Sequence, residues 1–187
     1  MKKLNFKGHD YLVRTESKDI TLKELFKIST ILNDEKQDYI EKWMGVISIL
    51  GSKELVEVIS TNKFTELVNQ INFGDVQSVI TPQIEVNNRI YKINLEDGKM
   101  ELSAKDVAKI EKIARSGSSW GVKAFAFMYR DESLTTTEHF DDAHISYKAK
   151  LFEDVVSAEV ATPVIFELSK CIVGNIEEII NANSKAV

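Results

Sequence analysis

The chain has 187 residues, 43% hydrophobic and 28% charged, and a formal net charge of −5 at pH 7. This composition is that of an ordinary folded globular protein, so disorder is not the default expectation. The negative charge, without any stripe of Lys and Arg, predicts no direct nucleic acid partner. The apolar runs are far shorter than the roughly 20 residues that span a bilayer, so we expect no membrane partner. No apolar segment follows the basic N-terminus, which predicts a cytoplasmic, uncleaved protein.

The first predicted elements are a hairpin and a capped helix. Phe6-Lys7-Gly8-His9-Asp10-Tyr11 has an apolar residue, a two-residue turn and a tyrosine in the order of a tight hairpin. Gly8 suits this turn because glycine adopts a positive φ at little cost. Thr21 stands three residues before Glu24, which is the spacing of a capping box, so we predict that a helix begins after Thr21.

The middle of the chain is predicted to be helical. One amphipathic helix is expected to end at Gly51 and to bury apolar residues spaced three and four apart. These residues are Tyr39, Ile40, Trp43, Met44, Ile47 and Leu50. One or two shorter helices follow, with a break around Ser60 to Asn62 and an end near Gly74. If the chain divides into domains, we expect the division in this region, which gives residues 1–80 and 81–187 as two parts. The alternative is that the whole chain forms one compact domain.

A second hairpin and helix resemble the first. Val86 to Tyr91 aligns with the first hairpin at an offset of 80 residues, with Asn87-Asn88 as its turn. Ser103 and Asp106 align with the first capping box, although the shorter acid is expected to fit less well. These matches indicate an internal duplication. The alternative is that a hairpin followed by a helix, which is a common order of elements, occurs twice by chance. The predicted fold is α+β, predominantly helical, with two hairpin-plus-helix units and additional packed helices.

The remaining elements are predicted from periodicity and helix boundaries. A helix to about Arg115 and a second helix from Trp120 to Tyr129 flank a Ser/Gly break, and a polar loop covers Asp131 to Asp142. The next helix is expected to bury Ala143, Tyr147, Leu151 and Val155. A final helix is expected to begin at Thr162-Pro163. Its buried stripe is predicted to comprise Val164, Leu168, Cys171, Ile172, Ile176 and Ile179.

Residues capable of metal binding gather in one segment. His139, Asp141, Asp142 and His144 can all ligate a metal, but the histidines are five apart, whereas paired ligands on a helix are three or four apart. We therefore favour a solvated loop with acids at the start of the next helix. A small metal protein or enzyme built around His139 to His144 is the less favoured alternative.

Other candidate sites are weaker. The Ser/Gly segment before Trp120 lacks the glycine spacing and the Lys-Ser/Thr ending of a phosphate loop. Cys171, the single cysteine, forms no internal disulfide and is expected to be a buried apolar residue. Trp43 and Trp120 are both expected in the core, with an interface as the alternative for Trp120. We predict that the protein is not an enzyme and has no cofactor, catalytic or metal-binding residue.

The order of elements resembles a known family. The "F-x-G-x-x-Y" hairpin leads to "ITLKELFKISTILND" and a helix ending in "ISILG", and the "I-x-V-N-N-R-I-Y-K-I" hairpin leads to "LSAKDVAKIEKI". "KAFAFMYRDE" and a late Tyr-Lys-Ala-Lys-Leu-Phe helix complete the order. This arrangement resembles the tail and baseplate hub assembly proteins of tailed bacteriophages. The resemblance covers most of the chain, and it lies in element order and apolar spacing.

The resemblance implies a function in particle assembly. We expect a non-enzymatic, chaperone-like factor in the host cytoplasm that binds phage structural proteins of the tail or baseplate. Its binding surface is expected to be an apolar helical groove or a sheet edge. The alternative is a permanent structural subunit of the virion or tail. Homo-oligomerisation and the residues of the partner interface are left open.

Overall fold

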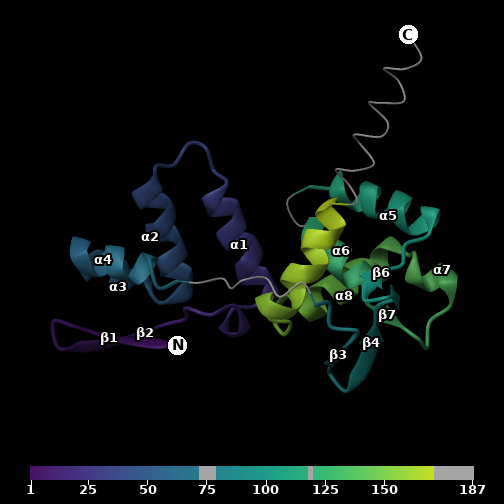
Figure 1. Ribbon diagram of the computed structural model, residues 1–187, viewed down its shortest axis with the longest axis horizontal. Coiled ribbons are helices and arrows are strands. Elements are labelled where there is room, and N and C mark those ends of the chain that lie inside the picture. The colour runs from purple at the N-terminus through teal and green to yellow at the C-terminus, as the bar shows by residue number, and fades with distance from the viewer. Residues whose placement is uncertain (72–78, 118–119, 171–187) are drawn as a thin grey trace, which may run out of the picture. The chain divides into compact units, whose positions relative to one another are not determined.

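The computed structural model describes residues 1–71, 79–117 and 120–170. Its fold is α+β and predominantly helical, as predicted (Figure 1). The chain forms two compact units: unit 1 comprises Met1–Gln77 and Val156–Glu159, and unit 2 comprises Ser78–Val155 and Val160–Val187. Whether residues 1–80 and 81–187 are independent domains stays a prediction. The expected helix end at Gly74 and the expected burial of Cys171, Ile172, Ile176 and Ile179 lie outside the described residues.

Unit 1 begins with the predicted hairpin. Strand β1 (Lys2–Phe6) pairs antiparallel with β2 (His9–Val13), and Leu4 lies opposite Tyr11. The turn residues Lys7 and Gly8 have φ values of 50° and 81°. Two consecutive positive φ angles are typical of a type I′ turn, whose twist matches that of the flanking strands.

Four α-helices and one short 3-10 helix complete the described part of unit 1. They are η1 (Ser17–Asp19), α1 (Leu22–Leu32), α2 (Tyr39–Leu50), α3 (Lys53–Val58) and α4 (Thr61–Val68). The predicted capping box begins α1: the Glu24 amide donates to the Thr21 hydroxyl over 3.3 Å, and the Thr21 amide donates to the Glu24 carboxylate over 3.0 Å. Helix α2 ends before Gly51, as predicted. Helices α1 and α2 lie side by side (Figure 1).

The core of unit 1 uses only part of the apolar residues predicted for α2. Val46, Ile47 and Leu50 are buried against β2, α1, α3 and α4. Tyr39, Ile40 and Met44 are exposed, so their predicted burial is wrong. The helix has apolar residues on more of its circumference than its neighbours cover, and periodicity alone does not say which part is covered.

The strands of unit 2 form a three-stranded sheet and a separate small hairpin. The sheet has the order β3 (Gln83–Val86), β4 (Arg89–Lys92), β7 (Arg130–Asp131), and the small hairpin pairs β5 (Leu95–Glu96) with β6 (Lys99–Met100). Asn87 and Asn88 form the predicted turn, with φ values of 51° and 60°. Ile84 lies opposite Tyr91, so the register matches that of the first hairpin. Duplication as the origin of this match stays a prediction.

The helices of unit 2 confirm some predicted boundaries and correct others. They are α5 (Ala104–Ala114), α6 (Trp120–Met128), α7 (Thr136–His139) and α8 (Asp142–Glu153), and residues 160–170 are also helical, in continuation of a helix that begins at residue 158 in unit 1. The Ser/Gly break between α5 and α6 is confirmed. The expected loop from Asp131 to Asp142 contains α7, because Thr135 and Glu138 form a capping box that the sequence reading missed.

The last helix begins earlier than predicted. It starts before Thr162-Pro163, because the chain just ahead of it is held by backbone pairing within unit 1. There the Leu22 amide donates to the Val156 carbonyl and the Ala158 amide donates to the Ile20 carbonyl, each over 2.7 Å. Among the described residues no helix is long and apolar enough to span a bilayer.

Aromatic packing dominates the core of unit 2. Phe152 of α8 meets the rings of Tyr91 and Phe125 edge-on, at centroid distances of 4.8 and 6.1 Å. The buried face of α8 comprises Ile145, Lys148, Ala149 and Phe152. The stripe predicted for this helix is therefore wrong, since Ala143, Tyr147 and Val155 are exposed and Leu151 is half-buried. Val164 and Leu168 are buried, as predicted.

Candidate functional site

The four residues weighed as metal ligands perform other tasks. Asp141 caps α8, where its carboxylate accepts from the His144 amide over 2.8 Å. Asp142, in the first turn, accepts from the ammonium groups of Lys109 and Lys112, each over 2.8 Å. The prediction that these acids lie at a helix start is thus confirmed. Across residues 1–71, 79–117 and 120–170, no three or more His, Cys, Asp or Glu side chains form a possible metal site.

His139 is a core residue rather than a surface ligand. Its side chain is 5% exposed, stacks on Phe127 at a centroid distance of 4.6 Å and meets Phe140 edge-on at 5.2 Å. Neither ring nitrogen has a hydrogen-bond partner within the described part of the chain. Burial, followed by repulsion from Lys148, lowers the pKa of His139 to about 4. The imidazole is therefore neutral at pH 7.

Lys148, on α8, is also a buried ionisable residue. Its side chain is 1% exposed, and its ammonium donates to the Tyr129 carbonyl over 2.9 Å. Burial lowers the pKa of Lys148 to about 8, although attraction to Asp131 acts in the opposite direction. A lysine with a lowered pKa is a candidate nucleophile. This ammonium is enclosed by protein, however, so a substrate cannot reach it without displacement of α8.

An accessible apolar surface lies on unit 1. Ile40 is 57% exposed and Met44 is 39% exposed, one turn apart on α2. Met44 also lines a cavity of about 400 Å³. We define the α2 surface as Ile40 and the lining of this cavity, which comprises Ile31, Gln37, Glu41, Met44 and Gly45.

A close approach of α1 to α2 shapes the α2 surface. A Cβ atom on Gly45 would lie 3.2 Å from Cγ2 of Ile31, closer than side chains normally pack. Glycine at this position therefore lets Ile31 lie against the α2 backbone. Sequence reasoning missed the surface because Ile40 and Met44 fit the helical stripe expected to be buried. The sequence did contain one indication of this surface, because α2 has apolar residues on more of its circumference than a single buried face requires.

Acidic side chains surround one end of the α2 surface. The segment from Asp34 to Glu41 carries four carboxylates, at Asp34, Glu35, Asp38 and Glu41, and one cation, Lys36. Asp38 and Glu41 form the capping box of α2, through amide-to-carboxylate bonds of 2.8 and 3.1 Å. The α2 surface therefore combines exposed apolar atoms with an acidic border.

The two tryptophans lie in different units and are both half-buried. Trp43 packs against the unit 1 core, as predicted, and its ring is 6.4 Å from that of Tyr39. Trp120 begins α6 in unit 2. Each unit thus carries a single tryptophan, which gives each a spectroscopic reporter of its own.

No known protein family, curated protein or solved structure matches the chain.

Proposed function

We propose that the protein is a non-enzymatic protein-binding factor whose α2 surface holds an apolar partner segment that carries Lys or Arg. The observation behind this proposal is the exposure of Ile40 and Met44 beside the cavity of about 400 Å³. Covering exposed apolar atoms contributes roughly 25 cal/mol per Å² of area removed from water. A concave apolar site with a polar border is typical of surfaces that bind an amphipathic helix.

The acidic border supports a basic partner. Glu35, Asp38 and Glu41 are exposed, and Glu41 is one of the residues that line the cavity. Lysine or arginine flanking the apolar segment would be attracted to these acids, and the attraction accelerates encounter more than it tightens the final complex. An acidic partner segment would be repelled for the same reason.

We place this activity in the assembly of a bacteriophage tail or baseplate. The support is the order of hairpins, capped helices and apolar segments along the sequence, which resembles the assembly proteins of tailed phages. The partner is then a tail or baseplate structural protein, and binding takes place in the host cytoplasm. A factor of this kind shields the apolar segment of its partner until that segment reaches its place in the particle.

Exchanging Ile40 and Met44 together for aspartate tests the α2 surface. We expect binding to the structural protein to weaken about a hundredfold, because two apolar contacts are lost and two charges face a surface that excludes water. Both side chains are exposed, so folding is expected to persist. The variant is co-expressed with each tail and baseplate protein of the same phage, and the affinity of purified pairs is measured by calorimetry.

Tyr147→Asp is the matched control. Tyr147 is an exposed apolar residue on α8, in unit 2, so its exchange adds a charge and leaves the α2 surface intact. Equal binding by wild type and the Ile40/Met44 variant would refute the α2 surface as the site. Failure of every structural protein to bind would refute the assembly function.

The composition of finished particles decides between the assembly factor and the alternative of a permanent subunit. Mass spectrometry of purified virions is expected to show far less than one copy of this chain per copy of its partner. Stoichiometric presence would instead establish a structural subunit and overturn the chaperone-like function.

A further inference from the structure

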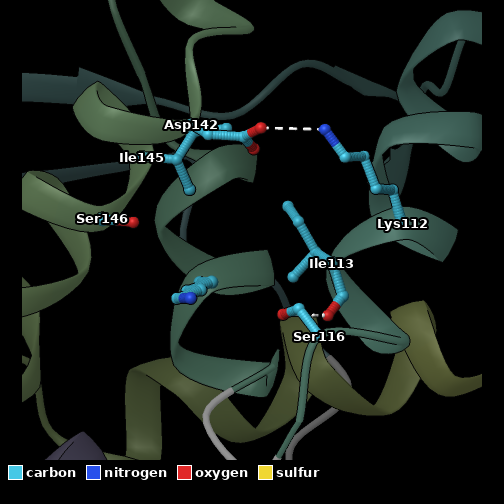
Figure 2. Close-up of a pocket in the computed structure, with 7 residues that line it drawn as sticks. Lys112, Ile113, Ser116, Asp142, Ile145 and Ser146 are labelled. Atoms are coloured by element: carbon cyan, nitrogen blue, oxygen red, sulfur yellow. Dashed lines mark hydrogen bonds and ion pairs between the residues drawn. The ribbon is translucent and has the colours of Figure 1, made fainter.

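A second concave site lies in unit 2, away from the α2 surface in sequence and in chemistry. It is a cavity of about 180 Å³ between α5, α6 and α8 (Figure 2). Two lysines, two serines, one aspartate and two isoleucines line it. They are Lys112, Ile113, Ser116, Lys123, Asp142, Ile145 and Ser146. Five of these seven residues carry a polar or charged side chain, against two of the five that line the cavity at the α2 surface.

The charges around the cavity do not balance. Asp142 is the single carboxylate among the described residues of the lining, and it already accepts from both Lys109 and Lys112 over 2.8 Å. Figure 2 shows the Lys112 ammonium turned toward this carboxylate. Hydrogen bonds from the two lysines lower the pKa of Asp142 to about 2, so it stays ionised at pH 7. In the part of the chain that the structure describes, Lys109, Lys112 and Lys123 thus have one carboxylate, that of Asp142, to balance their charges.

Lys123 is the unbalanced cation. It is the one charged residue of α6, whose other residues are apolar and mostly buried. No carboxylate within the described ranges forms an ion pair with it. A half-buried ammonium without a counter-charge costs free energy, which a bound anion would recover. The local charge of about two positive units matches a phosphate dianion better than a single carboxylate.

Hydroxyl groups complete the lining. The Ser146 hydroxyl makes no hydrogen bond to any described residue, so it is available as a donor to an anion. The Ser116 hydroxyl donates to the Ile113 carbonyl over 2.7 Å, and its lone pairs remain free to accept from an ammonium. Ser116 lies in the turn after α5 and Ser146 lies on α8, and Figure 2 shows the two serines apart from each other, so a ligand between them would meet groups from two segments.

We propose that this cavity binds a phosphate group, held by Lys112 and Lys123 and by the hydroxyl of Ser146. Lysine ammonium groups bind phosphate as point charges, and their hydrogen bonds to it are charge-assisted. The volume accommodates a phosphate group with part of its hydration water, and it is too small for a whole nucleotide. Free phosphate and the phosphate of a nucleoside monophosphate share this chemistry. The site is independent of the protein-binding function proposed above.

Phosphate binding is tested by titrating the full-length protein in phosphate-free buffer at pH 7 and constant ionic strength. Amide shifts in nitrogen-proton NMR spectra report the site, with sodium phosphate and a nucleoside monophosphate as separate ligands. We expect saturable shifts at Lys123 and Ser146 with millimolar affinity. Similar affinity for both ligands indicates that the phosphate group alone is recognised, and tighter nucleotide binding indicates contacts beyond the cavity. Both results support the site.

Lys123→Gln is expected to weaken phosphate binding about tenfold, because the uncompensated charge is removed. Ser146→Ala keeps every charge and is expected to weaken binding about threefold; it serves as the test if the lysine variant does not fold. Lys150→Gln, at an exposed position of α8 outside the lining, is the matched control and should bind like wild type. Absence of saturable shifts, or equal binding by all the variants, would overturn the proposal.

Discussion

Asp106→Ala is expected to lower the unfolding free energy of unit 2 by about 3 kcal/mol, the largest effect anticipated here for a single side chain. Asp106 is 3% exposed and performs two tasks. Its carboxylate accepts from the Ser103 amide over 3.0 Å, which completes the capping box of α5. Its other oxygen accepts from the Arg130 guanidinium over 2.8 Å. Alanine loses the cap and leaves a partly buried guanidinium without its carboxylate.

The corresponding acids of unit 1 provide graded controls. Glu24 closes the box of α1 and binds Arg14 through two bonds of 2.7 and 2.9 Å, but both side chains are more exposed than Asp106. Arg14 also donates to the Ile49 carbonyl over 2.6 Å, so Glu24→Ala should cost less, about 2 kcal/mol. Glu41→Ala affects an exposed capping box whose acid forms no ion pair with any described residue, and it should cost about 1 kcal/mol.

Urea unfolding followed by tryptophan fluorescence measures these differences. In a Trp43→Phe background the signal of Trp120 reports unit 2, and in a Trp120→Phe background Trp43 reports unit 1. An Asp106→Ala cost no larger than that of Glu41→Ala would show that burial adds nothing to the cap and its ion pair. The interpretation of Asp106 as a buried structural carboxylate would then be wrong.

His139→Phe is expected to remove most of the pH dependence of unit 2 stability between pH 6.5 and 4. The pKa of His139 is about 4 in the folded protein, below the ordinary value of 6.5. As the pH falls through this range, the unfolded chain binds a proton that the folded chain does not, so the unfolding free energy of wild type decreases. The decrease due to His139 should total about 3 kcal/mol by pH 4.

The surroundings of His139 also predict how His139→Phe changes the unfolding free energy at pH 7. Its two ring nitrogens are buried without a hydrogen-bond partner in the described part of the chain, and each such group costs roughly 1 kcal/mol or more. Phenylalanine keeps the stacking on Phe127 without these polar atoms, so the variant should be at least as stable as wild type at pH 7. Lys148 and Arg130 repel a protonated ring, and attraction from Asp106 offsets only part of this.

Urea midpoints at pH 7, 6, 5 and 4, read from Trp120, provide the measurement. His144 also contributes a smaller slope, since burial lowers its pKa, so His144→Gln is measured in parallel. His9→Gln changes an exposed histidine of β2 and should leave the pH profile of unit 2 unchanged. If His139→Phe retained the full pH dependence of wild type, burial of a neutral His139 would be refuted.

The hairpin turns and the capping boxes were predictable from the sequence because each depends on residues only a few positions apart. Gly8 and the Asn87-Asn88 pair adopt the positive φ angles that tight hairpins require. Thr21 and Ser103 begin helices with a side chain three residues away that completes each box. The shorter Asp106 was expected to fit poorly, yet it closes its box fully, because the backbone at α5 brings both groups within 3.2 Å.

The candidate sites depended on packing that no short segment contains. Ile40 and Met44 have the apolar character of core residues, and only the way in which α1 and α3 pack against α2 leaves them exposed. The cavity of Lys112 and Lys123 likewise joins residues of three helices. Long-range proximity of this kind leaves no periodic pattern in the sequence.

The amino-acid sequence by itself determined the fold class, the two hairpin turns and the starts of α1, α5 and α6, since these follow from backbone preferences and neighbouring side chains. The tertiary structure decided which face of each helix is buried. On α8 it buries Lys148 and exposes Tyr147, the reverse of what hydrophobicity alone predicts. The physical reason is that burial depends on which elements cover a face, and the Tyr129 carbonyl, supplied by a distant segment, holds the Lys148 ammonium inside.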